Sequence, residues 1–371
     1  MLYTDIRYIP KEDRKRTIER LILLRRQLDE EIPEKTAANT LLLATWNIRE
    51  FKDNRRKESL FYIAEIISRF DLVAVQEVAR DKTGLEKVMK LLGKNWDYIA
   101  TDSTEGVAGG GECMAFLYDT NKVHFKNMAG EIVLPDKKGI KSLQFARTPF
   151  CVSFQAGWFK FNLATVHIYY GTDEKVNERR LYEIQSLSKA MSARAKKEKF
   201  NYVVLGDFNI PDIDCDYMKA LESNGFHIPN AIKEHPTDLG GTYHYDQIAF
   251  NMKTNDLMTV YNEKQQKSGA FNFTKSVFRE EDEAVYTPYF DRETIDETLE
   301  KARVKKENKE KKKAKEQSLA VELTEEEKAE IVTNYYLKTY RTFEMSDHLP
   351  LWVQMKVDYS AKYLEDRLKE A

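Results

Sequence analysis

Polar residues that could carry out chemistry stand beside short apolar runs along the sequence. Such runs predict buried strands, so these polar residues belong near strand ends. They are Asn47, Glu77, His167, Asp207, Asn209, Asp246, Asp347 and His348. Ligands in sheet folds bind beyond the strand ends, where side chains leave the sheet for loops. The sequence therefore predicts one acidic pocket that contains two histidines.

The residue types in this pocket fit a hard divalent cation and a phosphate. Carboxylates without accompanying cysteines, and with scattered histidines, favour Mg²⁺ or Mn²⁺ over zinc. Such an ion can offset the charge of a phosphate oxygen, and a histidine paired with a carboxylate can act as general acid or base or donate to phosphate. Asp207 and Asn209 suit an attack by water, one accepting a proton and the other donating to phosphate. Metal-assisted hydrolysis of a phosphoester is the chemistry that this combination serves best.

Strands and helices alternate along most of the chain, which indicates an α/β fold. Apolar residues at consecutive positions in several strands indicate a sheet buried on both faces. Residues 11–31 predict an amphipathic helix that Pro33 ends. We interpret this helix as an extension packed on the main domain, with a dimerisation helix as the alternative. Further strands are expected at 41–46, 72–76, 96–101, 113–119, 159–167 and 202–205, and further helices at 57–69, 84–92 and 174–197.

The composition is that of a globular chain. Its 371 residues, 42% of them hydrophobic, are enough for a sizeable core. A net charge of −2 excludes a uniformly basic coat for nucleic acid but leaves local patches open. The sequence shows neither the roughly 18 consecutive apolar residues of a membrane span nor a signal peptide at its start. Cys113, Cys151 and Cys215 stand far apart, which favours a reducing compartment, and we expect a cytoplasmic protein.

A charged segment at 279–333 differs from the rest of the chain. Between residues 301 and 315, nine Lys or Arg stand against two Glu. Thr324 and Glu327 have the spacing of a helix capping box, and few residues of the segment could line a core. We expect an exposed, mostly helical insertion. A solvated charged arm is favoured, and an arm that contacts phosphates is the alternative.

Six short motifs span most of the chain, from residue 45 to residue 350. They are Thr45-Trp46-Asn47-Ile48, Val75-Gln76-Glu77-Val78, Val166-His167, Gly206-Asp207-Phe208-Asn209, Tyr245-Asp246-Gln247-Ile248 and Met345-Ser346-Asp347-His348-Leu349-Pro350. In these motifs and their order, the chain resembles the endonuclease/exonuclease/phosphatase family, the group that contains deoxyribonuclease I and exonuclease III. The resemblance implies a four-layer sandwich of two mixed β-sheets, packed face to face and flanked by helices. It also implies a divalent metal, Mg²⁺ or Mn²⁺.

Deoxyribonuclease I is the nearest pattern within that family. Glu112, ahead of an apolar strand, resembles a glutamate that supports a catalytic histidine. Arg147 resembles an arginine near the substrate phosphate, with a surface salt bridge as the alternative. The resemblance implies metal binding by Glu77, Asp347 and Asn47. It implies catalysis by three pairs, which are His167 with Glu112, His348 with Asp246, and Asp207 with Asn209. It also implies substrate binding by Arg147 and Asn209.

The function predicted from the sequence is a Mg²⁺- or Mn²⁺-dependent phosphodiesterase, a nuclease that hydrolyses DNA. A phosphatase of a small phosphoester, such as an inositol phosphate, is the first alternative. An inactive, nucleic-acid-binding family member is the second, and the intact set of carboxylates and histidines argues against it. The expected partner is nucleic acid, DNA ahead of RNA, with no membrane and with a monomer favoured. The expected parts are a helical extension at 1–38, a catalytic domain at 39–358 with the insertion at about 279–333, and a helical tail at 359–371.

Overall fold

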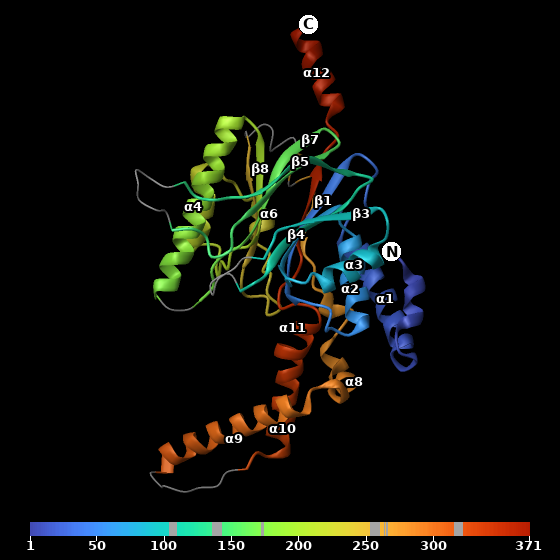
Figure 1. Cartoon of the computed structure of the whole chain (residues 1–371), viewed down its shortest axis with the longest axis vertical. Coiled ribbons are helices and arrows are strands. Elements are labelled where there is room, and N and C mark those ends of the chain that lie inside the picture. The colour runs from blue at the N-terminus through green and yellow to red at the C-terminus, as the bar shows by residue number, and fades with distance from the viewer. Residues whose placement is uncertain are drawn as a thin grey trace.

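The computed structural model of the chain contains two mixed β-sheets packed face to face (Figure 1). It describes residues 1–103, 110–135, 143–171, 174–252, 260–262, 264, 266–314 and 322–371, with the backbone alone at 175–176 and 311–314. The six-stranded sheet has the order β10-β11-β1-β2-β4-β3, and the five-stranded sheet has the order β5-β6-β7-β8-β9. In chain order the strands are β1 (Thr40–Phe51), β2 (Leu72–Val78), β3 (Trp96–Ala100), β4 (Cys113–Asp119), β5 (Val123–Glu131), β6 (Phe150–Ala156), β7 (Phe159–His167), β8 (Asn201–Asp207), β9 (Asp246–Asn251), β10 (Ser268–Ala270) and β11 (Leu351–Lys356).

Two parallel strand pairs, one in each sheet, bring polar residues to one edge of the sandwich. β1 and β2 run parallel, with Asn47 opposite Gln76. β7 and β8 run parallel, with His167 opposite Asp207. β9 runs antiparallel to β8, so its first residue, Asp246, lies opposite Asp207. The ends of strands from both sheets therefore meet where the sequence predicted a pocket.

The core between the sheets is filled by the inward-facing side chains of both. Fully buried residues from the two sheets include Leu43, Ala74, Phe116, Phe154, Phe161 and Leu205. One buried polar side chain, Gln76, crosses this interface, because its Nε2 donates to Thr165 Oγ1 at 2.8 Å and to Thr45 Oγ1 at 3.1 Å. Buried amides are stable only with such partners. Gln76 therefore links the two sheets immediately before the end of β2.

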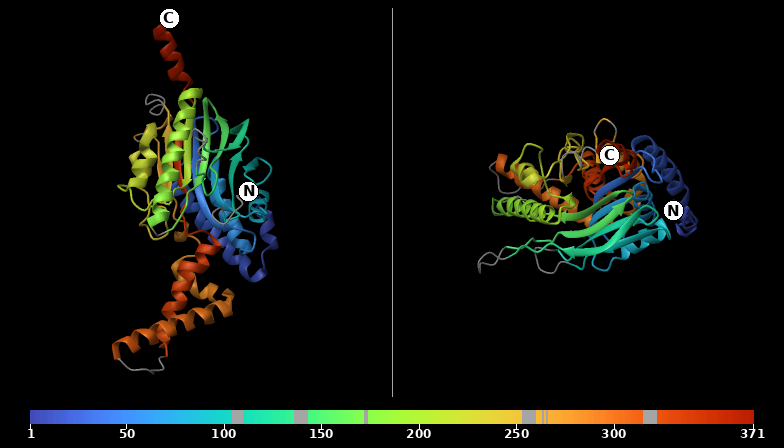
Figure 2. Two further views of the ribbon diagram at one scale, coloured as in Figure 1. Left: turned by 60° about the vertical axis from the view of Figure 1, so that its left-hand side comes forward. Right: turned by 90° about the horizontal axis from the view of Figure 1, so that it is seen from above.

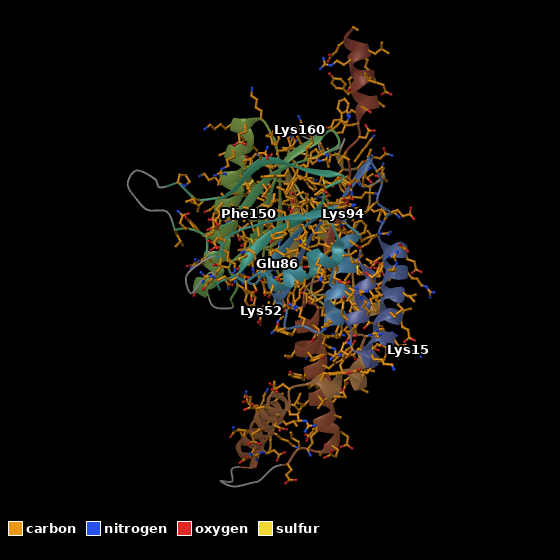
Figure 3. All side chains as sticks on the ribbon, turned by 45° about the vertical axis from the view of Figure 1, so that its right-hand side comes forward. Lys15, Lys52, Glu86, Lys94, Phe150 and Lys160 are labelled. Carbon is orange, nitrogen blue, oxygen red and sulfur yellow. The ribbon has the colours of Figure 1, made fainter. Side chains whose placement is uncertain are left out.

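Helices cover the outer sides of both sheets (Figure 2). Beside the six-stranded sheet lie α1 (Lys11–Glu31), α2 (Lys57–Ser68) and α3 (Thr83–Leu92), and beside the five-stranded sheet lie α4 (Glu174–Glu198) and α5 (Asp216–Glu222). The short helix α6 (Asn230–Lys233) contacts β9 of one sheet and β10 and β11 of the other. α1 has the predicted bounds and buries Leu21, Leu24 and Leu28. Charged side chains such as Lys15 and Lys160 lie at the periphery, around a densely packed interior (Figure 3). The predicted fold class, a sandwich of two mixed sheets flanked by helices, is confirmed.

The charged segment forms a pair of helices that projects from the sandwich (Figure 1). The pair consists of α9 (Arg292–Ala314) and α10 (Glu325–Tyr335), and the predicted capping box is present at the start of α10. Lys306 Nζ lies 2.7 Å from Glu327 Oε2 and so joins the two helices. Lys301 and Arg303 pair with glutamates of α9 itself. The end of the lysine run, 311–315, lies outside the described side chains.

The base of this arm contains packed aromatic side chains. α8 (Glu283–Tyr286) leads into the arm, and the chain returns through a π-helix at Tyr336–Tyr340 and α11 (Arg341–Glu344). Tyr286 and Phe290 are buried, with ring centroids 6.0 Å from Tyr336 and 4.8 Å from Tyr340, respectively. Tyr286 and Phe290 are the buried apolar residues in the described part of 279–333, in keeping with the expectation that few residues there line a core, and they pack on aromatic residues that follow the segment. The aromatic residues come from both ends of the insertion, and their separation in sequence hides that they meet.

The C-terminal helix α12 (Ser360–Glu370) projects from the opposite end of the sandwich (Figure 1). Its leucines are exposed, while Tyr363 lies 5.4 Å from the ring of Trp158. Among the described residues, no helix combines the length and the apolar character that a membrane crossing requires.

Candidate active site

A close approach of two strands sets the geometry of the site. Gly206, immediately before Asp207, has a φ of +134°, and a Cβ atom there would lie 2.2 Å from the carbonyl oxygen of Val166. Only glycine fits this position without moving a strand. β8 can therefore lie tightly against β7, which places Asp207 beside His167.

The first carboxylate–histidine pair joins Asp246 and His348. His348 Nδ1 lies 2.7 Å from Asp246 Oδ2, and both side chains are buried. His348 Nε2 points to the other side, 3.8 Å from Asp207 Oδ2. Burial by itself lowers the pKa of His348, but the charges of Asp246 and Asp207 outweigh it and raise that pKa well above its usual value. The pair predicted from the sequence is present in the structure.

The second pair joins Glu112 and His167. His167 Nδ1 lies 3.1 Å from Glu112 Oε2, and His167 Nε2 lies 3.6 Å from Asp207 Oδ2. Arg147 Nε donates to the other oxygen of Glu112. Burial opposes the charged ring, but the carboxylate of Glu112 raises the pKa of His167. Burial by itself raises the pKa of Glu112, but His167 and Arg147 outweigh this effect and lower that pKa.

Asp207 stands at the centre, because one of its oxygens faces both imidazole rings. The same Oδ2 accepts a hydrogen bond from Asn47 Nδ2 at 3.0 Å, and Oδ1 accepts from the backbone N–H of Asn209 at 2.8 Å. Asn209 has a φ of +53° and donates its side-chain amide to the carbonyl oxygen of Ile168 at 2.8 Å. Asn209 therefore fixes the loop after β8, and its amide donates to the backbone in this structure.

Asn47 and Glu77 form the part of the site that suits a cation. Asn47 Nδ2 also donates to Glu77 Oε1 at 3.1 Å. Asn47 Oδ1 is buried and accepts no hydrogen bond from the described part of the chain. A buried acceptor without a donor is costly, and a bound cation would satisfy it. Glu77 has a φ of +58°, and its Oε2 accepts from the backbone N–H of Glu50 at 2.8 Å.

Two groups of metal-ligand type emerge from this arrangement. In each group the potential ligand atoms lie within 4.8 Å of one another: Glu77, Glu112 and His167 in one, and Asp207, Asp246 and His348 in the other. Asp347, expected to share an ion with Glu77, belongs to neither group among the described residues. Its side chain is exposed, and its carbonyl oxygen accepts from the N–H of Leu239 at 3.1 Å. Metal binding by Asp347 stays a prediction.

Ser346 is a supporting residue whose role the sequence did not reveal, although it precedes Asp347 in a motif. Its Oγ donates to the carbonyl oxygen of Asn47 at 2.5 Å and accepts from the N–H of His348 at 3.0 Å. The indole of Trp46 donates to the carbonyl oxygen of His348 at 2.9 Å. The end of β1 and the segment before β11 are therefore fixed to each other, and with them Asn47 and His348.

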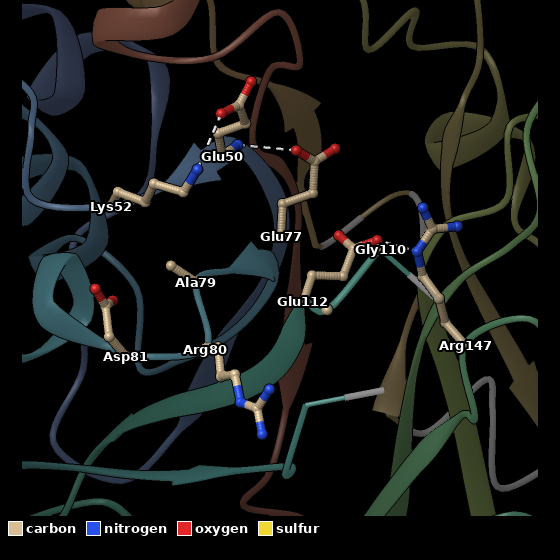
Figure 4. Close-up of a pocket in the computed structure, with 10 residues that line it drawn as sticks. Glu50, Lys52, Glu77, Ala79, Arg80, Asp81, Gly110, Glu112 and Arg147 are labelled. Atoms are coloured by element: carbon tan, nitrogen blue, oxygen red, sulfur yellow. Dashed lines mark hydrogen bonds and ion pairs between the residues drawn. The ribbon is translucent and has the colours of Figure 1, made fainter. Parts of the chain in front are cut away.

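A cavity of about 530 Å³ opens beside Glu77 and Glu112 (Figure 4). Figure 4 shows these two carboxylates on the same side of the cavity, with Arg147 next to Glu112. Lys52 and Arg80 also line it. Cationic side chains around a carboxylate site can hold the remaining charge of a phosphate ligand. Arg147 pairs with Glu112 at this cavity, and its contact with substrate phosphate stays a prediction. Lys52 is an additional cation that the motifs did not include.

Among known proteins, the chain is similar to several solved structures. No protein-family model matches the sequence, and no curated protein matches it. The chain is similar to the catalytic domain of human Nocturnin with bound sulfate, at 16% identity and a TM-score of 0.45, over 59% of this chain and 84% of that one. An endonuclease/exonuclease/phosphatase family protein from Bacteroides thetaiotaomicron is similar at 15% identity and a TM-score of 0.49, over 86% and 99%. TDP2 from Caenorhabditis elegans is similar at 11% identity and a TM-score of 0.49, over 85% and 75%.

Proposed function

We propose that this chain is a divalent-metal-dependent phosphoester hydrolase that cleaves phosphodiester bonds of nucleic acid, with DNA ahead of RNA. The observation that carries the proposal is the position of Asp207 between two carboxylate-bound histidines. Its Oδ2 lies 3.6 Å from His167 Nε2 and 3.8 Å from His348 Nε2. A phosphate placed at this point would meet one carboxylate and two imidazole nitrogens together.

Each group has a role that its surroundings favour. Asp207 would accept a proton from the attacking water, because it is the carboxylate that both imidazole Nε2 atoms face. His348 and His167, whose pKa values are raised by their carboxylate partners, would donate hydrogen bonds to phosphate oxygens. Donors aimed at oxygens that gain charge stabilise the transition state more than the ground state.

Glu77 and the buried Oδ1 of Asn47 would hold the metal, and Asp347 is proposed as a further ligand. A carboxylate with an amide oxygen is a donor set suited to Mg²⁺ or Mn²⁺. When bound, the ion would neutralise charge on the phosphate. Asn47 also donates from Nδ2 to Glu77 and Asp207, so it would hold the cation site and the base in a fixed relation.

A nucleic-acid substrate is supported by the surroundings of the cavity. Lys52, Arg80 and Arg147 line one cavity together with the carboxylates of Glu50, Glu77, Asp81 and Glu112, so the cavity offers cationic contacts beside the proposed metal site. Repeated phosphates gain affinity from each cation that they meet. A compact phosphoester such as an inositol phosphate is the alternative substrate, and the test must distinguish it from nucleic acid.

The test compares several phosphoesters in one assay. Supercoiled plasmid, linear duplex, single-stranded DNA, RNA and inositol phosphates are incubated with Mg²⁺, Mn²⁺ or EDTA. We expect metal-dependent cleavage of nucleic acid, and Asp207→Asn should reduce kcat by roughly 10²- to 10⁴-fold. Asp366→Asn, the same substitution on the exposed helix α12, should leave kcat unchanged. If only inositol phosphates release phosphate, the small-phosphoester alternative is supported in place of the nuclease. If no substrate gives a metal-dependent product, the proposed hydrolase is refuted.

A further inference from the structure

A group of tyrosines lies on the side of Asp207 where His348 stands. Tyr245 has its ring centroid 5.5 Å from that of His348, at an interplanar angle of 36°. Tyr243 stacks on Tyr245, with centroids 5.0 Å apart and an angle of 17°. Tyr243, Tyr245 and the nearby Tyr170 are called the aromatic wall below. The rings of His348, Tyr245 and Tyr243 form a continuous series that begins at the histidine.

Two members of the aromatic wall keep much of their surface in solvent. Tyr243 is 42% exposed and Tyr170 is 57% exposed. Burial raises the pKa of Tyr245 to about 12, with Tyr170, Tyr243 and Asp207 among the neighbours that add to the effect. Tyr245 therefore stays neutral in the working range of pH, and Tyr170 lies close enough to act on it. The wall adjoins the reacting centre and is open to a ligand.

The loop that carries Tyr243 and Tyr245 is held by its own hydrogen bonds. Asp238 Oδ1 accepts from the N–H of Tyr243 at 2.6 Å, and the carbonyl oxygen of Tyr243 accepts from the N–H of Thr237 at 2.8 Å. The carbonyl oxygen of Tyr245 accepts from the N–H of Phe208, next to Asp207, at 2.8 Å. The stacked rings are therefore positioned before any substrate arrives, which reduces the entropy lost on binding.

Tyr170 is positioned by a buried arginine, Arg180. Arg180 donates to the carbonyl oxygens of Asn209 at 3.0 Å and Gly171 at 2.7 Å. Its guanidinium lies 5.6 Å from the centre of the Tyr170 ring. A guanidinium over a ring face attracts it, so the backbone beside Tyr170 and its ring are both held in place.

We infer that the aromatic wall is a stacking site for an unpaired nucleobase attached next to the cleaved phosphate, so that single-stranded nucleic acid is the preferred substrate. This inference rests on the proposed function. Unpaired bases stack on aromatic side chains with little regard to sequence, because every base has a planar face. In a duplex those faces are already covered by neighbouring bases. The cavity beside Glu77 and Glu112, which Lys52, Arg80 and Arg147 also line, would then receive the adjacent backbone.

The first experiment measures binding without turnover, in EDTA. Oligothymidylate is titrated against an abasic tetrahydrofuran oligomer of the same length and charge. The wild-type chain should bind oligothymidylate roughly 5- to 100-fold more tightly, the range typical of one stacked base. Tyr243→Ala should remove most of this preference and leave the abasic affinity unchanged, whereas Tyr243→Phe should retain the preference.

Two further variants test whether the effect is specific to the aromatic wall. Tyr170→Ala removes a second, more exposed member of the wall and should also reduce the preference. Tyr8→Ala is the matched control, because Tyr8 is 58% exposed and lies in the N-terminal 3₁₀ helix at Tyr3–Tyr8. Equal binding of both oligomers by the wild type would overturn the inference. So would a Tyr243→Ala variant that loses affinity for both oligomers alike.

The second experiment measures cleavage with Mg²⁺ and Mn²⁺. The substrates are dithymidine phosphate and its two abasic analogues, which lack the base on one side or the other. Loss of one base should raise KM for the wild type by roughly 5- to 100-fold, and Tyr243→Ala should show no such difference. A wild-type chain that distinguishes the oligomers in binding but cleaves nothing would refute the proposed hydrolase and leave the stacking site standing. Cleavage with the same KM for all three substrates would refute the stacking site alone.

Discussion

Replacing Asp246 with asparagine removes the negative charge that contributes most to raising the pKa of His348. The two side chains are buried and joined by a contact of 2.7 Å between Asp246 Oδ2 and His348 Nδ1. The substitution keeps the size of the side chain and removes only its charge. The second carboxylate near His348, Asp207, lies 3.8 Å from Nε2 and remains. The pKa of His348 should therefore fall, but part of its elevation should persist.

The size of this change follows from the contact. A hydrogen bond to a charged group contributes about 1.5–3 kcal/mol, and one pKa unit corresponds to about 1.4 kcal/mol. The pKa of His348 should thus fall by roughly 1–2 units. If protonated His348 donates to the phosphate, activity declines as the pH rises through this pKa. The alkaline limb of kcat should therefore move to lower pH by about 1–2 units, and the loss at the optimum should be roughly 10²- to 10⁴-fold.

Stability should respond with the same sign. A histidine whose folded pKa is raised contributes stability that is complete below its unfolded value, about 6.5. This contribution disappears as the pH rises through the folded pKa. Asp246→Asn should therefore destabilise the metal-free chain most in acid and least in alkali, which urea unfolding at several pH values measures.

The assay combines a pH profile with a direct titration. Proton NMR of the His348 ring in EDTA reports its pKa, and cleavage rates with metal report the alkaline limb. His235, whose pKa burial lowers, is the internal control and should titrate unchanged, and Asp366→Asn is the control substitution. A His348 pKa and an alkaline limb that both match the wild type would refute the role of this pair.

Four other changes test the remaining parts of the site and its supports. Glu77→Gln should weaken Mn²⁺ binding by more than roughly 10- to 100-fold, which is the cost of losing a residue that only supports a metal ligand. Calorimetry that finds normal Mn²⁺ affinity would contradict the assignment of Glu77 as a cation ligand. Arg147→Ala should raise the pKa of His167, since the charge of Arg147 lowers it, and an NMR titration checks the direction. Arg55→Leu should cost about 3 kcal/mol in urea unfolding, because the buried guanidinium serves the carbonyl oxygens of Arg49, Phe343 and Met345. Deleting 300–318 should leave the salt dependence of nucleic-acid binding unchanged, because described lysines of the arm already pair with its glutamates; a slope that falls by about 0.7–0.9 per lost contact would instead establish contact with phosphates.

The carboxylate–histidine pairs could be predicted from the sequence only through the motifs that carry them. Asp246 and His348 are far apart in the chain and belong to segments beside different sheets. Periodicity predicts strands but does not say which strand ends meet. The structure brings these two together through Ser346 and Trp46, which fix the segment before β11 to the end of β1. The aromatic contacts at the base of the arm could not be predicted for the same reason, because Tyr286 and Tyr336 meet from its two ends.

The two sides of the site show where sequence patterns stop being informative. Asp207 and His167 occupy strand ends, and strand register alone places them opposite each other. The aromatic wall comes from loops, whose paths depend on contacts such as that of Asp238 with the N–H of Tyr243. Loops are also where related folds differ most and where specificity arises. Under the proposed function, the strand ends would carry the reaction, and the loop tyrosines would select the phosphoester that binds.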